Sequence, residues 1–469
     1  MVDPRLVPEP TVFVLYGATG DLAHRLVLPA IYRLAIEGLL PEKWRLVGNG
    51  RGDVAHEDFR ARAKDSLEKF GPKPSEGPWD QFCEALLFAG GGFDTNDPGC
   101  LLDVVGDAER ALGGEPQRIH YMAVPPVAFT ELTKAIGEHG LAERSRVVYE
   151  KPFGTSLESF TELDRAAHRV FDEQQIYRID HFLGKEATQD IHVLRFANGL
   201  FAGAWDRQHI ESVQIDVPES LDVSTRGSFY DATGAVLDMI VTHLFQLAAE
   251  VAMEPPASMD AEHIAAARED VIGAFRPLSR SEVVLGQYDG YTDVAGVADG
   301  SHTETFVALR LWIDNDRWRD VPFYLRTGKC LAQSKQHVSV IFRAPPQALG
   351  DLPVAGNVLT FDLAGDGGIE LSLVAKRPGV ELCLGSASAN LPLGQAFHTP
   401  VLPAYSRLIH DVFIGDRSTF TRPDGLAHVW EVAGALLGDK PEPLVYPRGS
   451  WGPDAAGDLP APGHWLLGP

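Results

Sequence analysis

Cysteine is scarce in this sequence, with four residues in a chain of 469. The four lie far apart and never at the short spacings that zinc sites and disulfide frameworks use. We therefore expect reduced, structural thiols and no metal site. The four are Cys83, Cys100, Cys330 and Cys383.

Long apolar runs are also lacking. The longest, such as the stretch from Val236 to Val241, is interrupted well before the roughly 20 apolar positions that a membrane helix needs. The first ten residues combine charged side chains with three prolines, which fits neither a signal peptide nor a transit segment. The sequence predicts no membrane span and, by default, a cytoplasmic protein.

Positive charge is in deficit, because 41 Lys and Arg face 65 Asp and Glu, a formal net charge of −24. Such a surface repels nucleic acids and anionic membranes, so we expect a small-molecule partner instead. An anionic ligand would then need a local group of cations. With 469 residues and 45% hydrophobic positions, the chain is too long for one core, and two or more domains are expected.

The first part of the chain alternates strands and helices. Residues 11–17 form a continuous β-branched and aromatic run, typical of a buried parallel strand, and residues 21–38 look helical. This alternation predicts a doubly wound α/β domain of Rossmann type over residues 1–178. Further strands are expected at 44–48, 119–124 and 145–149.

The rest of the chain, residues 179–469, is predicted as an α+β domain with a large, mainly antiparallel sheet, because its candidate strands follow one another with few helices between them. Helices are expected at 235–251 and 404–414, and the Pro- and Gly-rich tail from Lys440 is expected to lack regular structure. The candidate strands are 209–217, 305–314, 338–343, 358–363 and 368–376.

A glycine pattern, Gly-x-x-Gly-x-x-Ala from Gly17, lies where the first strand turns into the first helix. Backbone amides at such a turn can hold a pyrophosphate. Arg51 follows the second strand, where an arginine accepts the 2′-phosphate of NADP. A solvated turn arginine is the alternative, and Asp53 could still contact a ribose hydroxyl, so NAD remains open.

Two further clusters carry chemical groups. Lys151 ends the fourth strand, where ligand crevices of parallel sheets open. Asp180, His181 and Lys185 lie at an expected helix start, where Asp180 suits a cap. Residues four apart share a helix face, so His181 and Lys185 could bind a phosphate between them. The alternative is a capping Asp180 with the other two side chains solvated.

Asp238 and His243 interrupt the apolar pattern of the long helix at 235–251. A lone histidine on such a helix is more often a core residue than a catalyst. The role of His243 is indicated by motifs elsewhere in the chain. Five such motifs occur together in one protein family. The sequence resembles the glucose-6-phosphate dehydrogenases in GATGDLA, EKPFG, RIDHFLGKE, FYDATGAVLDMIVTH and RTGKCL, in that order and nearly end to end.

That resemblance implies oxidation of glucose 6-phosphate at C1 by hydride transfer to NADP, the first oxidative step of the pentose phosphate pathway, in a homodimer or homotetramer. His243 is then the general base and Asp180 the residue that orients it. His181 and Lys185 match the phosphate binders. The other implied substrate contacts are Lys151, Glu219, Asp238 and Lys329, and the implied cofactor contacts are Gly17, Thr19, Gly20, Asp21, Leu22, Arg51 and Lys151.

Three positions depart from the family pattern. Phe182 replaces a tyrosine, Leu26 replaces a lysine of the first helix, and Ser334 stands where relatives often carry a basic residue. These departures concern affinity for phosphate and cofactor more than the reaction. They leave a related hexose or hexose-phosphate dehydrogenase as one alternative, and a catalytically silent cofactor-binding protein as another.

Overall fold

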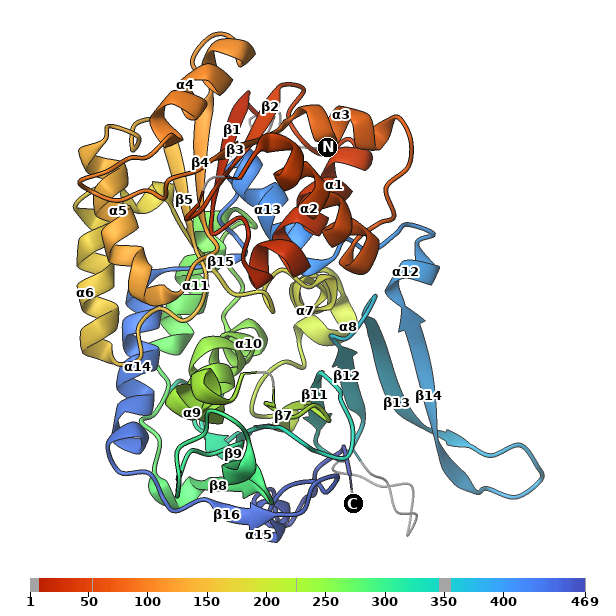
Figure 1. The fold of residues 1–469 in the computed structure, drawn as a ribbon. Coiled ribbons are helices and arrows are strands. Elements are labelled where there is room, and N and C mark those ends of the chain that lie inside the picture. Colours follow the sequence, from red (N-terminus) through yellow and green to blue (C-terminus); the bar gives the residue numbers. More distant parts are fainter. Residues whose placement is uncertain (1–7, 53, 225, 346–355, 469) are drawn as a thin grey trace. The chain divides into compact units, whose positions relative to one another are not determined.

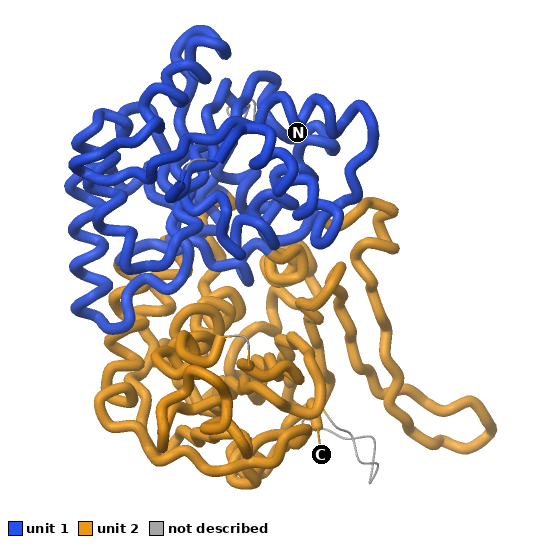
Figure 2. The backbone as a smooth tube through the Cα atoms, in the orientation of Figure 1, with its two compact units in different colours: residues 1–184, 260–265, 402–423 blue, residues 185–259, 266–401, 424–469 orange. Residues whose placement is uncertain are grey.

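The computed structural model describes residues 8–52, 54–224, 226–345 and 356–468. The chain divides into two compact units, each assembled from segments far apart in sequence (Figure 2). The predicted domain boundary after residue 178 is not tested by this division and stays a prediction. Unit 1 comprises 1–184, 260–265 and 402–423, and unit 2 comprises 185–259, 266–401 and 424–469.

Unit 1 is built on a seven-stranded sheet with the order β15-β6-β5-β4-β1-β2-β3 (Figure 1). All neighbours pair in parallel except β15, which is antiparallel to β6. The predicted Rossmann-type fold is confirmed. The strands are β1 Thr11–Tyr16, β2 Trp44–Asn49, β3 Leu86–Ala89, β4 Gln117–Met122, β5 Ser145–Tyr149, β6 Ile176–Ile179 and β15 Phe420–Thr421.

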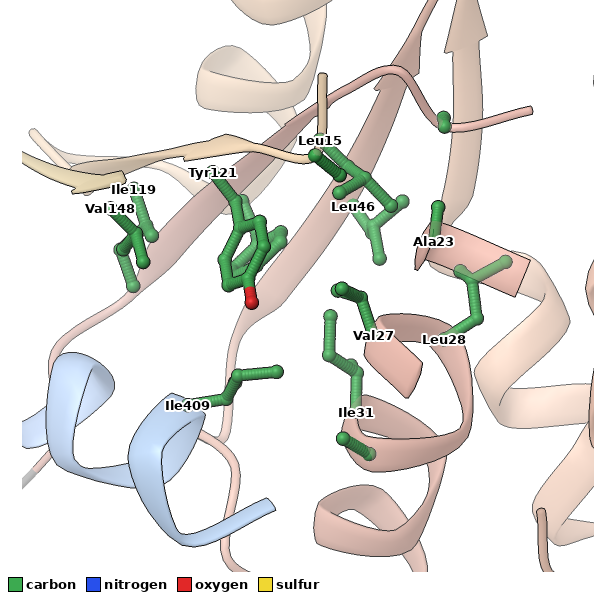
Figure 3. Close-up of a cluster of buried hydrophobic side chains, with 14 of the residues drawn as sticks. Leu15, Ala23, Val27, Leu28, Ile31, Leu46, Ile119, Tyr121, Val148 and Ile409 are labelled. Carbon is green, nitrogen blue, oxygen red and sulfur yellow. The ribbon is translucent and has the colours of Figure 1, made fainter. Parts of the chain in front are cut away.

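Helices from distant parts of the chain cover this sheet. Figure 3 shows Leu15 and Tyr121 of the strands beside Ile31 of α1 and Ile409 of α13, all buried in one cluster. Burial of each such side chain contributes about 1.5–3 kcal/mol. The helices are η1 Ala23–Val27, α1 Leu28–Ile36, α2 His56–Phe70, α3 Pro78–Glu84, α4 Leu101–Leu112, α5 Phe129–Glu138, α6 Leu157–His168 and α13 Ala404–Ile414.

Unit 2 contains a nine-stranded sheet with the order β14-β13-β12-β11-β7-β10-β9-β8-β16. It is mostly antiparallel, as predicted, but β7 pairs in parallel with β10 and β8 with β16. The strands are β7 Ile210–Pro218, β8 Val283–Tyr288, β9 Phe306–Leu311, β10 Phe323–Gly328, β11 His337–Phe342, β12 Val358–Asp362, β13 Gly368–Lys376, β14 Leu384–Pro392 and β16 Leu444–Tyr446.

The long predicted helix is present, with a π-helical centre. It comprises the π-helix η4 Val236–Leu244 and α10 Phe245–Ala252, and α9 Gly227–Ala235 leads into it across a kink at Gly234. By length and composition this stretch could cross a membrane, yet 94% of its most apolar window is buried inside the structure. It is therefore a core helix.

Apart from α13, the other α-helices after residue 185 are each shorter than this stretch. They include elements that the sequence analysis did not predict, such as α14. These helices are α7 Glu186–Ala197, α8 Gly199–Ala202, α11 Ala261–Ile272, α12 Leu393–Ala396, α14 Pro423–Gly438 and α15 Asp454–Gly457.

Two expectations from the sequence are wrong. The tail from Lys440 contains β16 and α15, because Leu444–Tyr446 pair with β8 and Tyr446 is buried there. Asp180, His181 and Lys185 lie in a turn, since α7 begins only at Glu186. His181 and Lys185 therefore share no helix face, and even fall in different units.

Candidate active site

The glycine loop of unit 1 lies on the carboxyl ends of three neighbouring strands. The amides of Gly17 and Ala18 both donate to the carbonyl of Asn49, at 3.0 and 3.1 Å. Gly17 has a φ of +74°, and a Cβ there would lie 2.3 Å from the carbonyl oxygen of Ala123. Only glycine therefore fits at the point where the loop crosses the sheet edge.

The loop leads directly into a helix, as an anion site requires. Gly20 donates to the carbonyl of Gly17 at 2.8 Å, and helical structure begins at Asp21. Asp21 is exposed and pairs with Arg25 at 3.8 Å, whereas Leu22 packs against the core. Leu26 is 39% exposed, so the position at which the family resemblance led us to expect a lysine faces outward without a charge.

A cavity of about 410 Å³ adjoins this loop within unit 1. Thr19 and His24 line it together with Arg62 of α2. Arg51 is exposed and follows Gly50, whose Cβ would lie 3.6 Å from the Thr19 hydroxyl. Thr19 and Arg51 thus flank the end of β2, while Asp53 lies outside the described residues.

Lys151 follows β5 and is half-buried, with a cis peptide bond to Pro152. Its neighbour Glu150 is buried and accepts hydrogen bonds from Tyr121 at 2.6 Å and from Tyr405 at 3.3 Å. Burial raises the pKa of the Glu150 carboxyl to about 6. The strand end therefore carries a carboxyl group that changes charge near neutral pH.

Asp180 and His181 follow β6 in a tight turn. The Asp180 carboxylate accepts from the amide of Phe182 at 2.9 Å, and its carbonyl accepts from Leu183 at 3.1 Å. His181 stacks on the ring of Tyr405, with the centroids 6.2 Å apart. Tyr405 of α13 therefore contacts both the Glu150 segment and the turn at His181.

Lys185 is the N-cap residue of α7 and is half-buried. Its ammonium donates to the Gln336 side chain at 2.8 Å and to the Leu363 carbonyl at 2.9 Å. A cation at the positive end of a helix dipole is unfavourable by itself, but an anion bound there gains from both charges. This end of α7 is therefore suited to a phosphate.

Glu219 and Lys329 lie side by side because β7 and β10 are parallel and end together. Lys329 is buried and forms ion pairs with Glu219 and, at 3.8 Å, with Asp238 of the π-helix. These three residues, far apart in sequence, form one cluster of alternating charge. Such a cluster can both donate to and accept from sugar hydroxyls.

The π-helix places Asp238 and His243 on one face. In a π-helix, residues five apart are hydrogen-bonded neighbours, whereas an α-helix turns them apart. His243 is completely buried, and Asp238 is buried beside Lys329. Local π-helices are frequent at functional sites, so this irregularity supports a functional reading of both residues.

The departures from the family pattern have distinct surroundings. Phe182 is buried next to His181, with ring centroids 4.8 Å apart. Ser334 exchanges hydrogen bonds with Ser220, at 2.9 Å from both its amide and its hydroxyl. Leu26, as described above, is exposed. Phe182 is thus packed against a neighbouring ring, Ser334 is hydrogen-bonded and Leu26 faces outward.

Two residues of this region, Glu150 and Tyr405, were not predicted from the sequence. Glu150 precedes Lys151, and Tyr405 lies 255 positions further along the chain. For Glu150 the sequence did hold a signal, because an acidic residue directly precedes Lys151, a proposed ligand residue. No spacing rule could have paired it with Tyr405.

Comparisons with known proteins support the same family along the whole chain. Two family models match, "Glucose-6-phosphate dehydrogenase, NAD binding domain" over residues 14–190 and "Glucose-6-phosphate dehydrogenase, C-terminal domain" over 192–465. A glucose-6-phosphate 1-dehydrogenase of Chlamydia pneumoniae is 34% identical over 97% of this chain and 95% of its own. That of Treponema pallidum is 36% identical over 96% and 93%.

Solved structures agree. A glucose-6-phosphate dehydrogenase in complex with its substrate glucose-6-phosphate superposes with a TM-score of 0.92, 31% identity and 99% coverage of both chains. The enzyme from Mycobacterium avium gives a TM-score of 0.88 and 33% identity, covering 98% of this chain and 99% of its own. This chain belongs to the glucose-6-phosphate dehydrogenase family.

Proposed function

We propose that the protein is a glucose-6-phosphate 1-dehydrogenase, which oxidises C1 of glucose 6-phosphate to the 6-phosphoglucono-1,5-lactone. The observation that carries this proposal is the cluster of Glu219, Asp238 and Lys329, with His243 on the same face of the π-helix as Asp238. This cluster offers a sugar both donors and acceptors next to a buried imidazole. The reaction is the first oxidative step of the pentose phosphate pathway.

In the proposed reaction, His243 takes the proton from the C1 hydroxyl, since imidazole is the side chain that most often serves as a general base. Asp180 orients that imidazole and stabilises the imidazolium that forms. NADP, when bound, accepts the hydride that leaves C1. The carbon is oxidised by two electrons, so one hydride and one proton leave the substrate.

Lys185 and His181 bind the phosphate in this proposal, supported by the position of Lys185 at the N-terminus of α7. Lys151, Glu219, Asp238 and Lys329 hold the sugar. The turn made by Gly17, Thr19, Gly20, Asp21 and Leu22 receives the pyrophosphate, and Arg51 the 2′-phosphate, with Lys151 near the nicotinamide. Support comes from the fit of Gly17 at the sheet edge and from the exposure of Arg51.

A second candidate is a hexose dehydrogenase with a relaxed requirement for phosphate. Phe182 and Ser334 favour it, since neither supplies the polar or charged group found in relatives. We further propose a cytoplasmic enzyme that assembles as a homodimer or homotetramer. Sedimentation of the purified protein would give the oligomeric state, and a monomer would contradict this proposal.

One set of initial rates tests the function. Glucose 6-phosphate and glucose are each offered with NADP and with NAD. The proposal expects the highest kcat/KM for glucose 6-phosphate with NADP. Equal kcat/KM for the two sugars would favour the hexose dehydrogenase, and the absence of turnover with all four combinations would contradict both.

A further inference from the structure

A buried ionic network in unit 2 joins residues of three helices, α7, α10 and α11. Glu250 of α10 pairs with His192 of α7 and, at 2.6 Å, with Arg268 of α11. The exposed fractions of Glu250, Arg268 and His192 are 1%, 4% and 7%. Burial by itself raises the pKa of Glu250, yet attraction to Arg268 and His192 holds it at about 2. The carboxylate is therefore charged inside the protein.

A second link joins α7 to α10. Arg195, one turn after His192 on α7, donates to the carbonyl of Met253 at 2.8 Å and to that of Glu250 at 3.4 Å. Glu250 lies in the last turn of α10 and Met253 is its C-cap residue, and carbonyls at a helix C-terminus lack intrahelical donors. Arg195 and the ion pair therefore connect α10 to α7 at two points.

In each of the two segments, a network residue follows a proposed functional residue by the same number of positions. Lys185 precedes His192 by seven residues, and His243 precedes Glu250 by seven. Lys185 is the N-cap residue of α7, and the π-helix that carries His243 continues directly into α10, so each proposed functional group lies on the same continuous segment as a network residue, about two turns before it. Because His192 is bonded to Glu250, the distance between Lys185 and His243, which precede them on the two segments, is also constrained.

We propose that the His192–Glu250 pair, held by Arg268, is a positioning device that sets the spacing between Lys185 and His243. This inference rests on the proposed roles of those two residues. A sugar phosphate anchored at one end presents C1 at a fixed distance from its phosphate. A small change of spacing therefore moves the C1 hydroxyl away from the base and slows proton removal.

Stability alone does not account for the network. Buried ion pairs contribute little net stability, because desolvation of the charges offsets their attraction, and apolar residues of similar size often do as well. Charged hydrogen bonds, however, define direction and distance more narrowly than apolar contacts do. Such a network is therefore suited to holding two groups at a fixed distance and orientation.

The test compares an anchored with an unanchored substrate. His192→Leu should lower kcat for glucose 6-phosphate tenfold or more, while kcat for free glucose, which has no phosphate to anchor, should change less than twofold. His192→Gln can still donate to Glu250 and should recover most of the loss. An equal fall for both sugars, or none for either, would overturn the proposal.

Double variants provide the second readout. If His192 acts through Lys185, His192→Leu should have no further effect on glucose 6-phosphate turnover in a Lys185→Ala background; additive losses would contradict this. Should His192→Leu fail to fold, Arg195→Met, which removes the second link, should show the same selective loss, and equal losses for the two sugars would overturn the proposal.

Two controls separate positioning from general destabilisation. Val193→Ala changes the exposed neighbour of His192 and should leave both rates unchanged. Leu436→Ala truncates a buried residue of α14 and should lower stability without altering the ratio of the two kcat values. A wild-type enzyme inactive on both sugars would contradict the proposed function itself, whereas an active one with an unchanged ratio in His192→Leu would contradict only the positioning.

Discussion

Lys329 illustrates how much a single residue depends on its partners. It is buried and pairs with Glu219 and Asp238, so one cation balances two carboxylates. The remaining negative charge can accept hydrogen bonds from sugar hydroxyls, while the ammonium can donate to one. Glu219 and Lys329 directly follow two strands and Asp238 lies in the π-helix, and a neutral residue in place of any one of them changes the net charge of the cluster.

At His243 we expect a loss of turnover with the fold retained. His243→Asn keeps a polar group of similar size but removes the base, so kcat should fall by about 10²- to 10⁴-fold. Binding of glucose 6-phosphate, measured by calorimetry, should change little. Turnover close to that of the wild type would exclude His243 from proton transfer.

At the phosphate end, Lys185→Ala and His181→Ala should raise KM for glucose 6-phosphate far more than KM for glucose. Charge-assisted hydrogen bonds to the phosphate, worth about 1.5–3 kcal/mol each, exist only for the phosphorylated sugar. KM values for both sugars in each variant check this. Equal changes for the two sugars would show that these side chains do not bind the phosphate.

Glu150 should make stability depend on pH. Its pKa is raised from the ordinary 4.5 to about 6 by burial, so the folded state favours the protonated form. That contribution is fully present below pH 4.5 and is lost as the pH rises through 6, about 2 kcal/mol in all. Glu150→Gln stays neutral, so its free energy of unfolding should rise relative to the wild type by this amount between pH 4.5 and 7.5.

Urea unfolding of both proteins across this pH range makes the comparison. Parallel curves would show that Glu150 ionises in the folded protein as it does in the unfolded chain. The hydrogen bonds from Tyr121 and Tyr405 favour the ionised form and oppose the effect of burial, so Tyr405→Phe should enlarge the pH dependence.

At the scale of elements, sequence patterns located most strands and the long helix but not their local geometry. Periodicity placed Asp238 and His243 on one helix, yet an α-helical period of 3.6 would turn residues five apart away from each other. Only the π-helical centre aligns them, and no pattern of side chains predicts it. Short strands such as β3 and β15 were missed because four or two residues carry too little periodicity.

Long-range pairings account for the rest of what the sequence could not supply. The turn at Asp180 was predicted as a helix start because its capping residue and charges fit one, but Asp180 instead closes a turn onto Phe182. The contacts between Glu150 and Tyr405, and between His192 and Glu250, join residues 255 and 58 positions apart. Side chains that meet only after folding leave no spacing to recognise.

The kink that begins the π-helix should be sensitive to one methyl group. Gly234 has φ +70° and ψ 170°, a conformation essentially restricted to glycine, and a Cβ would lie 2.5 Å from the Glu304 carboxylate. That carboxylate accepts from the amide of Val236 at 3.2 Å. Gly234→Ala should therefore cost about 1–3 kcal/mol of stability and lower kcat, since Asp238 and His243 follow directly.

Gly434→Ala is the matched control. Gly434 lies in α14 with no atoms within 4 Å of its would-be Cβ, so alanine there should stabilise the protein by up to about 1 kcal/mol. Urea unfolding and kcat of the two variants make the comparison. Equal stability changes at both positions would show that the kink at Gly234 is not constrained.

For the whole molecule, a net charge of −24 makes every bound anion dependent on local cations. Arg51 is exposed, and Arg62 lines the cavity beside Thr19. NADP carries one phosphate more than NAD, so it meets stronger general repulsion and requires these local charges more. If Arg51 binds the 2′-phosphate, selectivity for NADP depends on the balance between the attraction of this arginine and the repulsion from the net negative charge of the protein.

Ligand-linked stability measures this balance directly. A ligand that binds only the folded protein stabilises it by about 2.7 kcal/mol at 100 times its Kd. If Arg51 holds the 2′-phosphate, NADP should bind about 10- to 100-fold more tightly than NAD. At the same concentration NAD would then contribute only about 0.4–1.4 kcal/mol, and NADP should raise the unfolding midpoint clearly more.

Arg51→Ala should bring the NADP shift down to that of NAD while leaving the NAD shift unchanged. Salt should shrink the wild-type difference, because screening weakens an exposed contact. A wild-type protein that NAD stabilises as strongly as NADP does, or an Arg51→Ala variant that keeps the difference, would show that Arg51 is a solvated turn residue with no part in choosing the cofactor.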